Sequence, residues 1–497
     1  MRSFRILILS AAAFIPLSSA LADVTISNAP TQNISCSSGV CGPTAMDAVL
    51  NSNDLQKMLA AGNVSISTTG SGVQANNIVI ASKFAWKASY DLTLDAYDSI
   101  TVNAPVTVKG KASVTVQTND GGTGGVFVFG PQGRMDIRNL ATSLVINGAS
   151  FVLVSSVSSL ASAIRANPSG SFALADNYDA SNDGTYIGAP VPTWLNGEVQ
   201  GLGNTISNLS VYYAKKKDVV GGVFMLISDT GSVQNLRLVN EKPSIGNRAQ
   251  WGGLVGQNNG LLFNDSVTGT FKTKCSGCGF SGLVTTNYNQ AILSSSNVTI
   301  LSLRGFGAGL AGGNTGEIFA SHTQGSVSGK VAGGIVAYNI GHVVQSYSSA
   351  RIEGGDGAVL GGLVGDETTG DTTDSYATGT VSGGSGSTVG GLIGETDNPT
   401  STSYAIGAVS GGESSLVGGF IGQETATSVE NCYWDTDTSG TDEGTGEGNV
   451  SGLTGLTTEQ LQSGLPAGFD PNIWAEDPNI NNGFPYLIAN PPPTKSH

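Results

Sequence analysis

The feature that most constrains this chain is an internal repeat of about 28 residues. A glycine followed by aliphatic or aromatic residues recurs eight times between residues 222 and 421. The aligned positions are Gly222, Gly253, Gly282, Gly309, Gly334, Gly362, Gly391 and Gly419. Successive copies are separated by 31, 29, 27, 25, 28, 29 and 28 residues. Self-similarity at such a period indicates a repeat architecture, in which each unit packs on its neighbours.

Each unit has the composition of short strands, because runs of Val, Ile, Leu, Tyr and Thr are broken by Gly, Asn, Asp and Ser. A unit of this size cannot bury its own apolar side, so the units must stack, with like side chains about 4.8 Å apart. One predicted buried column is Leu254, Leu283, Leu310, Ile335, Leu363, Leu392 and Phe420. The next is Val255, Val284, Ala311, Val336, Val364, Ile393 and Ile421. The sequence therefore predicts an all-β, right-handed parallel β-helix (β-solenoid) with short capping helices, and glycines at corners that need positive φ.

A second motif, as in DSYATGTVSG from Asp374, recurs within the units. Its aligned serines are Ser266, Ser321, Ser346, Ser375 and Ser403, and Cys432 takes their place in the last unit. We interpret Cys432 as a small stacked residue rather than a nucleophile. Tyrosines directly follow this row at Tyr347, Tyr376, Tyr404 and Tyr433.

Neighbours on a strand point to opposite faces, so inward serines predict an outward ladder of tyrosines. Such a ladder could bind sugar faces or a partner protein. Alternatively, its rings only stack on one another and stabilise the coils.

The units resemble the GLUG motif of bacterial surface proteins, among them filamentous-haemagglutinin-like adhesins and some streptococcal IgA peptidases. The resemblance rests on "GGLVG…SYATGTVSG" and covers about residues 219–440. "GLGNTISNLSV" from Gly201 resembles the coil that precedes such repeats, and "NGFPYL" from Asn482 resembles the end of the array. The resemblance implies a β-helical bacterial protein that is secreted or displayed at the surface, and a possible outer-membrane secretion partner. The motif itself carries no catalytic residues.

The N-terminus has the pattern of a signal peptide over residues 1–22. Arg2 and Arg5 precede an apolar run that is too short to span a bilayer, and Ala20-Leu21-Ala22 is a cleavage signal. We therefore expect export by the Sec pathway to a secreted, extracellular or cell-surface location.

The rest of the chain divides by composition. We expect an N-terminal segment over 23–62 with a helix at 52–61. A β-rich section follows over 63–155, in which apolar and polar residues alternate, and it resembles the coils of haemagglutinin-type exoproteins. A connecting segment follows over 156–218, with a helix predicted at 153–166, and leads into the repeats at 219–440. A C-terminal linker and cap over 441–497 includes a short helix that begins at Thr457.

Charge and cysteine usage exclude some classes. The formal net charge of -15 argues against a nucleic-acid partner, which requires a basic face. Cys36 and Cys41 flank a small loop that a disulfide could close, and Cys275 and Cys278 form CSGC. A zinc or redox site at CSGC lacks partners, since the chain has no second CxxC and only 3 histidines. A local disulfide formed in an oxidising compartment is the preferred interpretation.

Two further chemistries are possible. A carbohydrate-active β-helix enzyme, a polysaccharide lyase or hydrolase, would use paired carboxylates. The candidates are Asp366, Glu367, Asp371, Asp374, Glu395, Asp397, Glu424 and Glu430. Calcium could bind Asp435, Asp437 and Ser439 in DTDTSG, or Asp179 and Asp183 in DASNDG. Both loops lack the terminal bidentate Glu of a calcium loop, and turn-forming residues give such patterns by default.

We therefore predict a non-catalytic solenoid, without a cofactor unless calcium binds, whose role is adhesion or surface contact. Its partner would be a glycan or protein on a host or neighbouring cell. A purely structural spacer is the remaining alternative.

Overall fold

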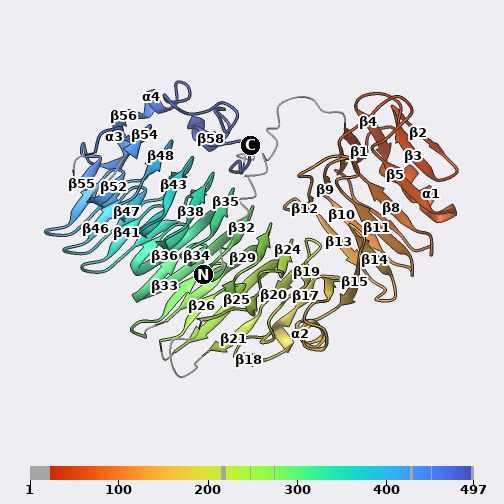
Figure 1. Ribbon diagram of the computed structural model, residues 1–497, viewed down its shortest axis with the longest axis horizontal. Helices are drawn as coiled ribbons and strands as arrows, with labels where there is room; N and C mark the ends of the chain where they lie inside the picture. Colours follow the sequence, from red (N-terminus) through yellow and green to blue (C-terminus); the bar gives the residue numbers. More distant parts are fainter. Residues whose placement is uncertain are drawn as a thin grey trace, which may run out of the picture. The chain divides into compact units, whose positions relative to one another are not determined.

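The computed structural model describes residues 23–213, 220–246, 248–273, 275–425, 429–448 and 450–493 (Figure 1). The predicted signal peptide lies outside these residues. The chain divides into two compact units, Met1–Ser150 and Phe151–His497. Within the described part of the chain, none of the helices combines the length and apolarity needed to cross a membrane.

The first unit is a parallel β-solenoid, as its alternating sequence predicts. Three successive coils each contribute three strands that pair in parallel with their counterparts in the next coil. The coils are β6 (Asn77–Ile80), β7 (Phe84–Trp86) and β8 (Leu92–Asp95); β9 (Ile100–Val102), β10 (Pro105–Val108) and β11 (Ser113–Gln117); and β12 (Phe127–Phe129), β13 (Arg134–Ile137) and β14 (Ser143–Ile146). Their side chains alternate between buried and half-buried, so every second residue fills the interior.

The predicted helix of the first unit is present as α1 (Ser52–Ala61). The side chain of Asn51 accepts a hydrogen bond from the backbone N–H of Asn53 and so caps the helix. β1 (Asp23–Ser27) and β4 (Ala48–Asn51) form the first parallel pair. The antiparallel hairpin of β2 (Ile34–Ser37) and β3 (Val40–Pro43) is closed by the Cys36–Cys41 disulfide, with a Cα–Cα distance of 4.1 Å.

The second unit is also a parallel β-solenoid, and its coils coincide with the sequence repeat (Figure 1). One coil comprises β42 (Val364–Glu367), β43 (Asp371–Thr373), β44 (Tyr376–Ala377), β45 (Val381–Ser382) and β46 (Thr388–Gly390). Each strand pairs in parallel with its equivalent in the next coil, namely β47 (Ile393–Thr396), β48 (Thr400–Ser401), β49 (Tyr404–Ala405), β50 (Val409–Ser410) and β51 (Leu416–Gly418).

Both predicted apolar columns are confirmed. The second column is in register from Val255 to Val284, Ala311, Val336, Val364, Ile393 and Ile421. In the first column each backbone N–H donates to the carbonyl of the equivalent residue in the next coil, as from Leu254 to Leu283 at 2.8 Å. All members of both columns are fully buried. Stacking of like side chains therefore builds the core of the second unit.

The aligned glycines serve a purpose other than the one predicted. They were expected at corners with positive φ, but none of those from Gly253 to Gly419 has one. Instead the backbones of successive coils approach too closely for a side chain. A Cβ on Gly362 would lie 2.0 Å from the carbonyl oxygen of Gly391, and a Cβ on Gly391 would lie 2.0 Å from that of Gly419.

Positive φ occurs at other positions of the coils than the aligned glycines, and most of the residues that adopt it there are not glycines. The residue before each serine or cysteine of the second motif, or its equivalent, has a φ between 43° and 58°. These residues are Asn235, Asn264, Leu293, Ala320, Gln345, Asp374, Thr402 and Asn431. The strands on both sides of the turn are fixed by their neighbours, so the fold imposes the left-handed conformation on residues that seldom adopt it.

The remaining helices refine the predicted boundaries. The helix expected at 153–166 is α2 (Val157–Ala166), because β15 (Ala149–Val154) occupies its first residues and Ser156 forms a capping box with Ser159. The short helix expected at Thr457 is α4 (Thr458–Leu461), with Thr457 as its N-cap. We call residues 457–493 the C-terminal segment.

Candidate functional site

The serine row faces the interior and forms a chain of hydrogen bonds between coils. The backbone N–H of Ser321 donates to Ser346 Oγ, that of Ser346 to Ser375 Oγ and that of Ser375 to Ser403 Oγ, all at 3.0–3.1 Å. The prediction that Ser266 belongs to this row is wrong by one position, because Asp265 occupies its place in the row. Its backbone N–H donates to Ser294 Oγ, and its carboxylate accepts from the N–H of Leu236.

Cys432 ends this row. Its thiol is fully buried and donates to the carbonyl oxygens of Thr400 and Glu430 at 3.6 and 3.5 Å. Burial raises the pKa of the Cys432 thiol to about 12. A thiol held in the neutral form inside the solenoid is not a nucleophile, which agrees with the structural interpretation of this residue.

The tyrosine row faces away from the solenoid interior, as predicted, but it is not exposed. Tyr347, Tyr376, Tyr404 and Tyr433 are buried in a cluster separate from the main core. The rings of Tyr347, Tyr376 and Tyr404 stack at centroid distances of 4.9 and 5.0 Å and within 6° of parallel. The prediction of a solvent-exposed aromatic ladder is therefore wrong. The alternative interpretation, in which the tyrosine rings stack on one another, agrees with the structure.

The C-terminal segment covers the row, and the repeats alone gave no signal for this contact. Leu461, Phe469 and Trp474 pack against the tyrosines. The indole N–H of Trp474 donates to Asp374 Oδ1 at 3.2 Å, and the hydroxyl of Tyr404 donates to the carbonyl of Pro485 at 2.6 Å. The predicted cap thus lies along the side of the solenoid, from the last coils back towards the coil of Ser321, where Asn490 binds.

The candidate carboxylates are divided between the interior and the surface. Asp366 and Glu395 lie in register on β42 and β47 and belong to the outward row of the nine-stranded sheet. Partial burial raises the pKa values of both, and the charge of Asp397 raises them further. Within the described part of the chain, no Lys, Arg or His forms an ion pair with any of the three.

Exposed apolar side chains adjoin these carboxylates. Tyr338 on β37 (Val336–Asn339) is in register with Asp366 and is 38% exposed. Ile340, two residues later, is 51% exposed, and Tyr288 takes the equivalent position two coils earlier with the same exposure. We call this surface the contact face, defined by Tyr288, Tyr338, Ile340, Asp366, Glu395 and Asp397.

Glu367 points to the opposite side of β42 and ends an internal ladder of amides. Asn258, Asn287, Asn314 and Asn339 are fully buried, and each Nδ2 donates to the side-chain oxygen of the next residue at 2.8–2.9 Å. Glu367 Oε1 accepts from Asn339 Nδ2 at 2.9 Å and from Thr372 Oγ1 at 2.7 Å. Burial raises its pKa to about 7. Sequence inspection missed this row, although the asparagines recur with the period of the repeat.

The other candidate carboxylates do not join a site with Asp366 and Glu395. Asp371 pairs with His342 Nδ1 on the preceding coil. Asp374 binds Trp474 and Thr402 beside the tyrosine row. Glu424 is nearly buried in the inward row that includes Glu367, whereas Glu430 is exposed on β53 (Val429–Glu430).

The two candidate calcium loops are turns whose oxygens bind donors of the chain. Asp435 caps α3 (Thr436–Ser439), accepting from the backbone N–H groups of Asp437 and Thr438 and from Thr458 Oγ1. Asp437 accepts from the backbone N–H of Thr458, and Ser439 Oγ donates to the carbonyl of Thr441.

In the other loop Asp179 accepts from Ser181 and Asn208, and Asp183 accepts from the hydroxyls of Tyr178 and Tyr186. Among the described residues, no group of three or more His, Cys, Asp or Glu is arranged to hold a metal.

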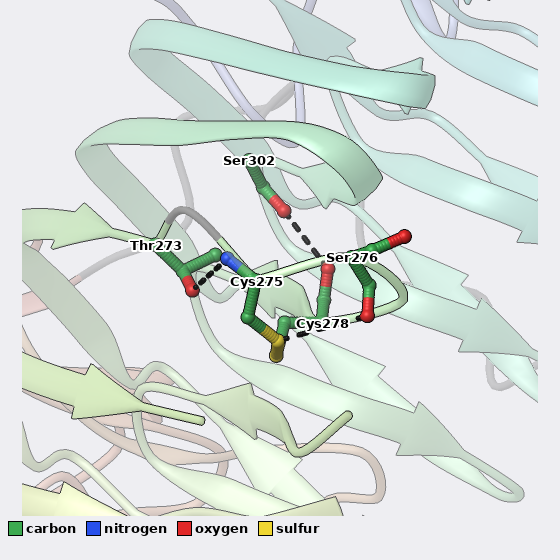
Figure 2. Close-up of a disulfide and its surroundings, with 5 residues drawn as sticks. All are labelled: Thr273, Cys275, Ser276, Cys278 and Ser302. Carbon is green, nitrogen blue, oxygen red and sulfur yellow. Dashed lines mark hydrogen bonds between the residues drawn. A yellow bond between two sulfur atoms is a disulfide. The ribbon is translucent and has the colours of Figure 1, made fainter. Parts of the chain in front are cut away.

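Cys275 and Cys278 form a disulfide across the CSGC loop, with a Cα–Cα distance of 5.6 Å (Figure 2). The N–H of Cys275 donates to Thr273 Oγ1 at 3.1 Å, and Ser302 Oγ donates to the carbonyl of Cys278 at 2.9 Å. The hydroxyl of Ser302 thus ties the loop to the next coil. With the sulfurs bonded to each other, the loop has no thiolate to offer a zinc ion.

Comparisons with known proteins identify no family. No family model matches the chain, and no curated protein matches it. One similar solved structure is a putative immunoglobulin A1 protease from Bacteroides ovatus, at 19% identity and a TM-score of 0.32. The match covers 69% of this chain and 93% of that chain.

Proposed function

We propose that this protein is a non-catalytic, exported β-solenoid that mediates adhesion or surface contact through its contact face. The observation that supports this proposal is the exposure of Tyr338 and Ile340 beside carboxylates that no cation of the described chain neutralises. Aromatic side chains give a binding surface large apolar area at low entropic cost. Contact with a glycan or protein of a neighbouring or host cell would use both features.

The charge of this face favours a partner with positive groups. Asp366 and Glu395 lie on adjacent strands, and like charges in that position are mutually unfavourable. A basic protein surface or an amine-bearing glycan would relieve this repulsion. Long-range attraction of this kind mainly raises the association rate and weakens with salt.

Export is part of the same proposal. The two disulfides Cys36–Cys41 and Cys275–Cys278 are of a kind that forms and persists in oxidising compartments outside the cytosol. Secretion or surface display would bring the contact face to its partner.

Binding of the purified protein to cells, matrix proteins and a glycan array tests the proposal. We expect Tyr338→Ala to weaken binding about tenfold or more, because Tyr is enriched among the few residues that carry most of the binding energy of an interface. Tyr90→Ala is the matched control, because Tyr90 is 40% exposed and lies in the other unit. Equal binding by both variants would contradict the proposed face. Uniformly negative binding would favour the spacer role.

A second candidate function rests on the pairing of Asp366 with Glu395. Adjacent strands place their Cα atoms about 4.8 Å apart, and retaining glycosidases need two carboxyl groups about 5–5.5 Å apart. The raised pKa of both groups favours an acid role for one of them. Turnover of pectin, alginate or a host glycan that is lost in Asp366→Asn and in Glu395→Gln would establish this enzyme and overturn the non-catalytic proposal.

A further inference from the structure

The outer side of the three-stranded sheet β7–β10–β13 carries most of the positive charge of the first unit (Figure 1). Residues 23–150 contain seven Lys and Arg residues, and six of them lie at the ends of these strands or in the turns next to them. We call this surface the basic face, defined by Lys83, Lys87, Lys109, Lys111, Arg134 and Arg138. The chain as a whole has a formal net charge of -15, so its total charge conceals this face.

The register of the strands arranges five of these cations in two rows across successive coils. The first row is Lys87, Lys109 and Arg138, each of which directly follows the last residue of its strand, and these last residues are paired in register. The second row contains Lys83 and Arg134, with Pro105 between them. Adjacent coils lie about 4.8 Å apart, so the first row places like charges side by side. This arrangement costs the folded state some stability, as directly opposed like charges do in a sheet.

The basic face is only partly neutralised by the protein itself. Asp136 is the one acidic residue of the three strands, and its side chain is 2% exposed. It accepts from Arg134 Nε at 2.9 Å and lies 3.9 Å from Arg138 Nη2. Among the described residues, no carboxylate forms an ion pair with Lys83, Lys87 or Lys109. The face therefore keeps a net positive charge.

A groove of about 530 Å³ lies along the second row. Lys83 and Arg134 line it together with Ala85 and Thr107, which belong to the outward row between the two rows of cations. Gln56 of α1 also lines the groove, and its Oε1 accepts from the backbone N–H of Ala85 at 3.1 Å. The volume falls within the range of about 300–1,000 Å³ that is usual for small-molecule sites.

The rows and the groove together indicate the chemistry of a ligand. Cations that repeat with each coil suit a polymer that repeats a negative group, and the hydroxyl and amide groups of the lining suit the hydroxyls of a sugar. Double-stranded DNA carries about one charge per 1.7 Å, which is far denser than the spacing of about 4.8 Å within a row. A flat protein surface would contact the rows but leave the groove unfilled.

We propose that the basic face binds an acidic polysaccharide with one carboxylate on each sugar ring. One ring would occupy the groove, and the carboxylates would pair with the cations of the two rows. The basic face belongs to the first unit and the contact face to the second, so this proposal does not rest on the function proposed above.

Calorimetric titration of the mature chain with hexagalacturonate tests the proposal. We expect binding that weakens as salt is added, and at least tenfold weaker binding of the fully methyl-esterified hexamer, which has the same rings without their charges. The triple variant Lys83→Gln/Lys87→Gln/Lys109→Gln should bind hexagalacturonate about tenfold more weakly or worse, because each exposed ion pair is worth up to about fivefold in affinity. Its Tm should not fall, since these lysines have no ion-pair partner in the described chain.

The matched control is Lys57→Gln/Lys242→Gln/Lys272→Gln, which removes three exposed charges elsewhere and changes the net charge equally. This control should bind nearly as the wild type does. Tyr338→Ala should also bind as the wild type does, which separates this site from the contact face.

The proposal is overturned if hexagalacturonate does not bind at concentrations up to about 10 mM, which corresponds to very weak association. Equal affinity of the two triple variants, or of the hexamer and its methyl ester, would also overturn it. Tighter binding of a single-stranded DNA of equal charge would assign the face to nucleic acid instead. Self-association at low salt that only the first triple variant abolishes, without binding of the hexamer, would assign it to a second copy of the chain.

Discussion

Replacement of Glu367 by Gln should remove a pH-dependent loss of stability from the second unit. The ordinary pKa of the carboxyl is 4.5, and burial raises it to about 7 in the folded chain. Between these two values the unfolded chain releases the proton while the folded chain keeps it. The free energy of unfolding of the wild type therefore falls as pH rises through this window, and it levels off above about pH 7.

The magnitude follows from the shift. Each pKa unit is worth about 1.4 kcal/mol, so a shift from 4.5 to about 7 costs about 3 kcal/mol in all. About 2 kcal/mol of this loss falls between about pH 5.5 and pH 8.5, a range that avoids precipitation near the isoelectric point of 4.5.

The amide of Gln imitates the protonated acid, since its oxygen can accept from Asn339 and Thr372 while its nitrogen donates to Thr396. Asp371 adds to the raised pKa of the wild type, and its charge does not destabilise an uncharged amide in the same way.

Native-state hydrogen exchange of the amides in β42 and β47 is the suitable assay, because a repeat protein can open one region at a time. Glu367→Gln should be more protected than the wild type by a factor that grows about thirtyfold between about pH 5.5 and pH 8.5. The comparison of two proteins at each pH cancels the chemical exchange rate and the carboxyl groups that do not interact with Glu367. A ratio that stays constant across this range would refute the reasoning.

Three further predictions concern the stacked rows and the turns. Gly391→Ala should destabilise the solenoid by about 3 kcal/mol or more in denaturant, because its Cβ would lie 2.0 Å from the carbonyl oxygen of Gly419. Gly355→Ala, with nothing within 4 Å of the new Cβ, should be nearly neutral. Cys432→Ser should fold with an unchanged Tm, and the wild-type thiol should resist alkylation until the protein unfolds. The Asp435 carboxylate accepts hydrogen bonds from groups of the chain itself, so EDTA should leave Tm unchanged. A fall of several degrees would restore the calcium interpretation.

The rows of the solenoid could be predicted from the sequence because stacking converts a period into contacts. Val364 and Ile393 are 29 residues apart and lie side by side. The same logic extends to Glu367, which follows Asn339 in a row of asparagines and so could have been recognised as an acid in an internal position. The period alone could not show whether the glycines serve a turn or a close approach, because both exclude a side chain.

The cover over the tyrosine row could not be predicted in this way. Asp374 and Trp474 are 100 residues apart, and the C-terminal segment has no repeat that would give its register on the solenoid. Its position is determined by apolar contacts with Tyr376 and Tyr404 and by hydrogen bonds to their neighbours. Alternation along a strand predicts which face a side chain takes, but it does not predict whether another segment covers that face.

The alternation of side chains along the strands also places Asp366 and Glu395 together on the contact face. Stacking places Asp366 directly beside Glu395, and this arrangement of like charges costs the folded state some stability. The fold does not require it, because Thr286 and Gln423 occupy the same outward row without charge. A cationic partner would bind more tightly because of this arrangement, since its binding would remove the repulsion between the two carboxylates. Neutralising Asp366 and Glu395 should therefore stabilise the free protein slightly while it weakens attachment, and a spacer would show only the first effect.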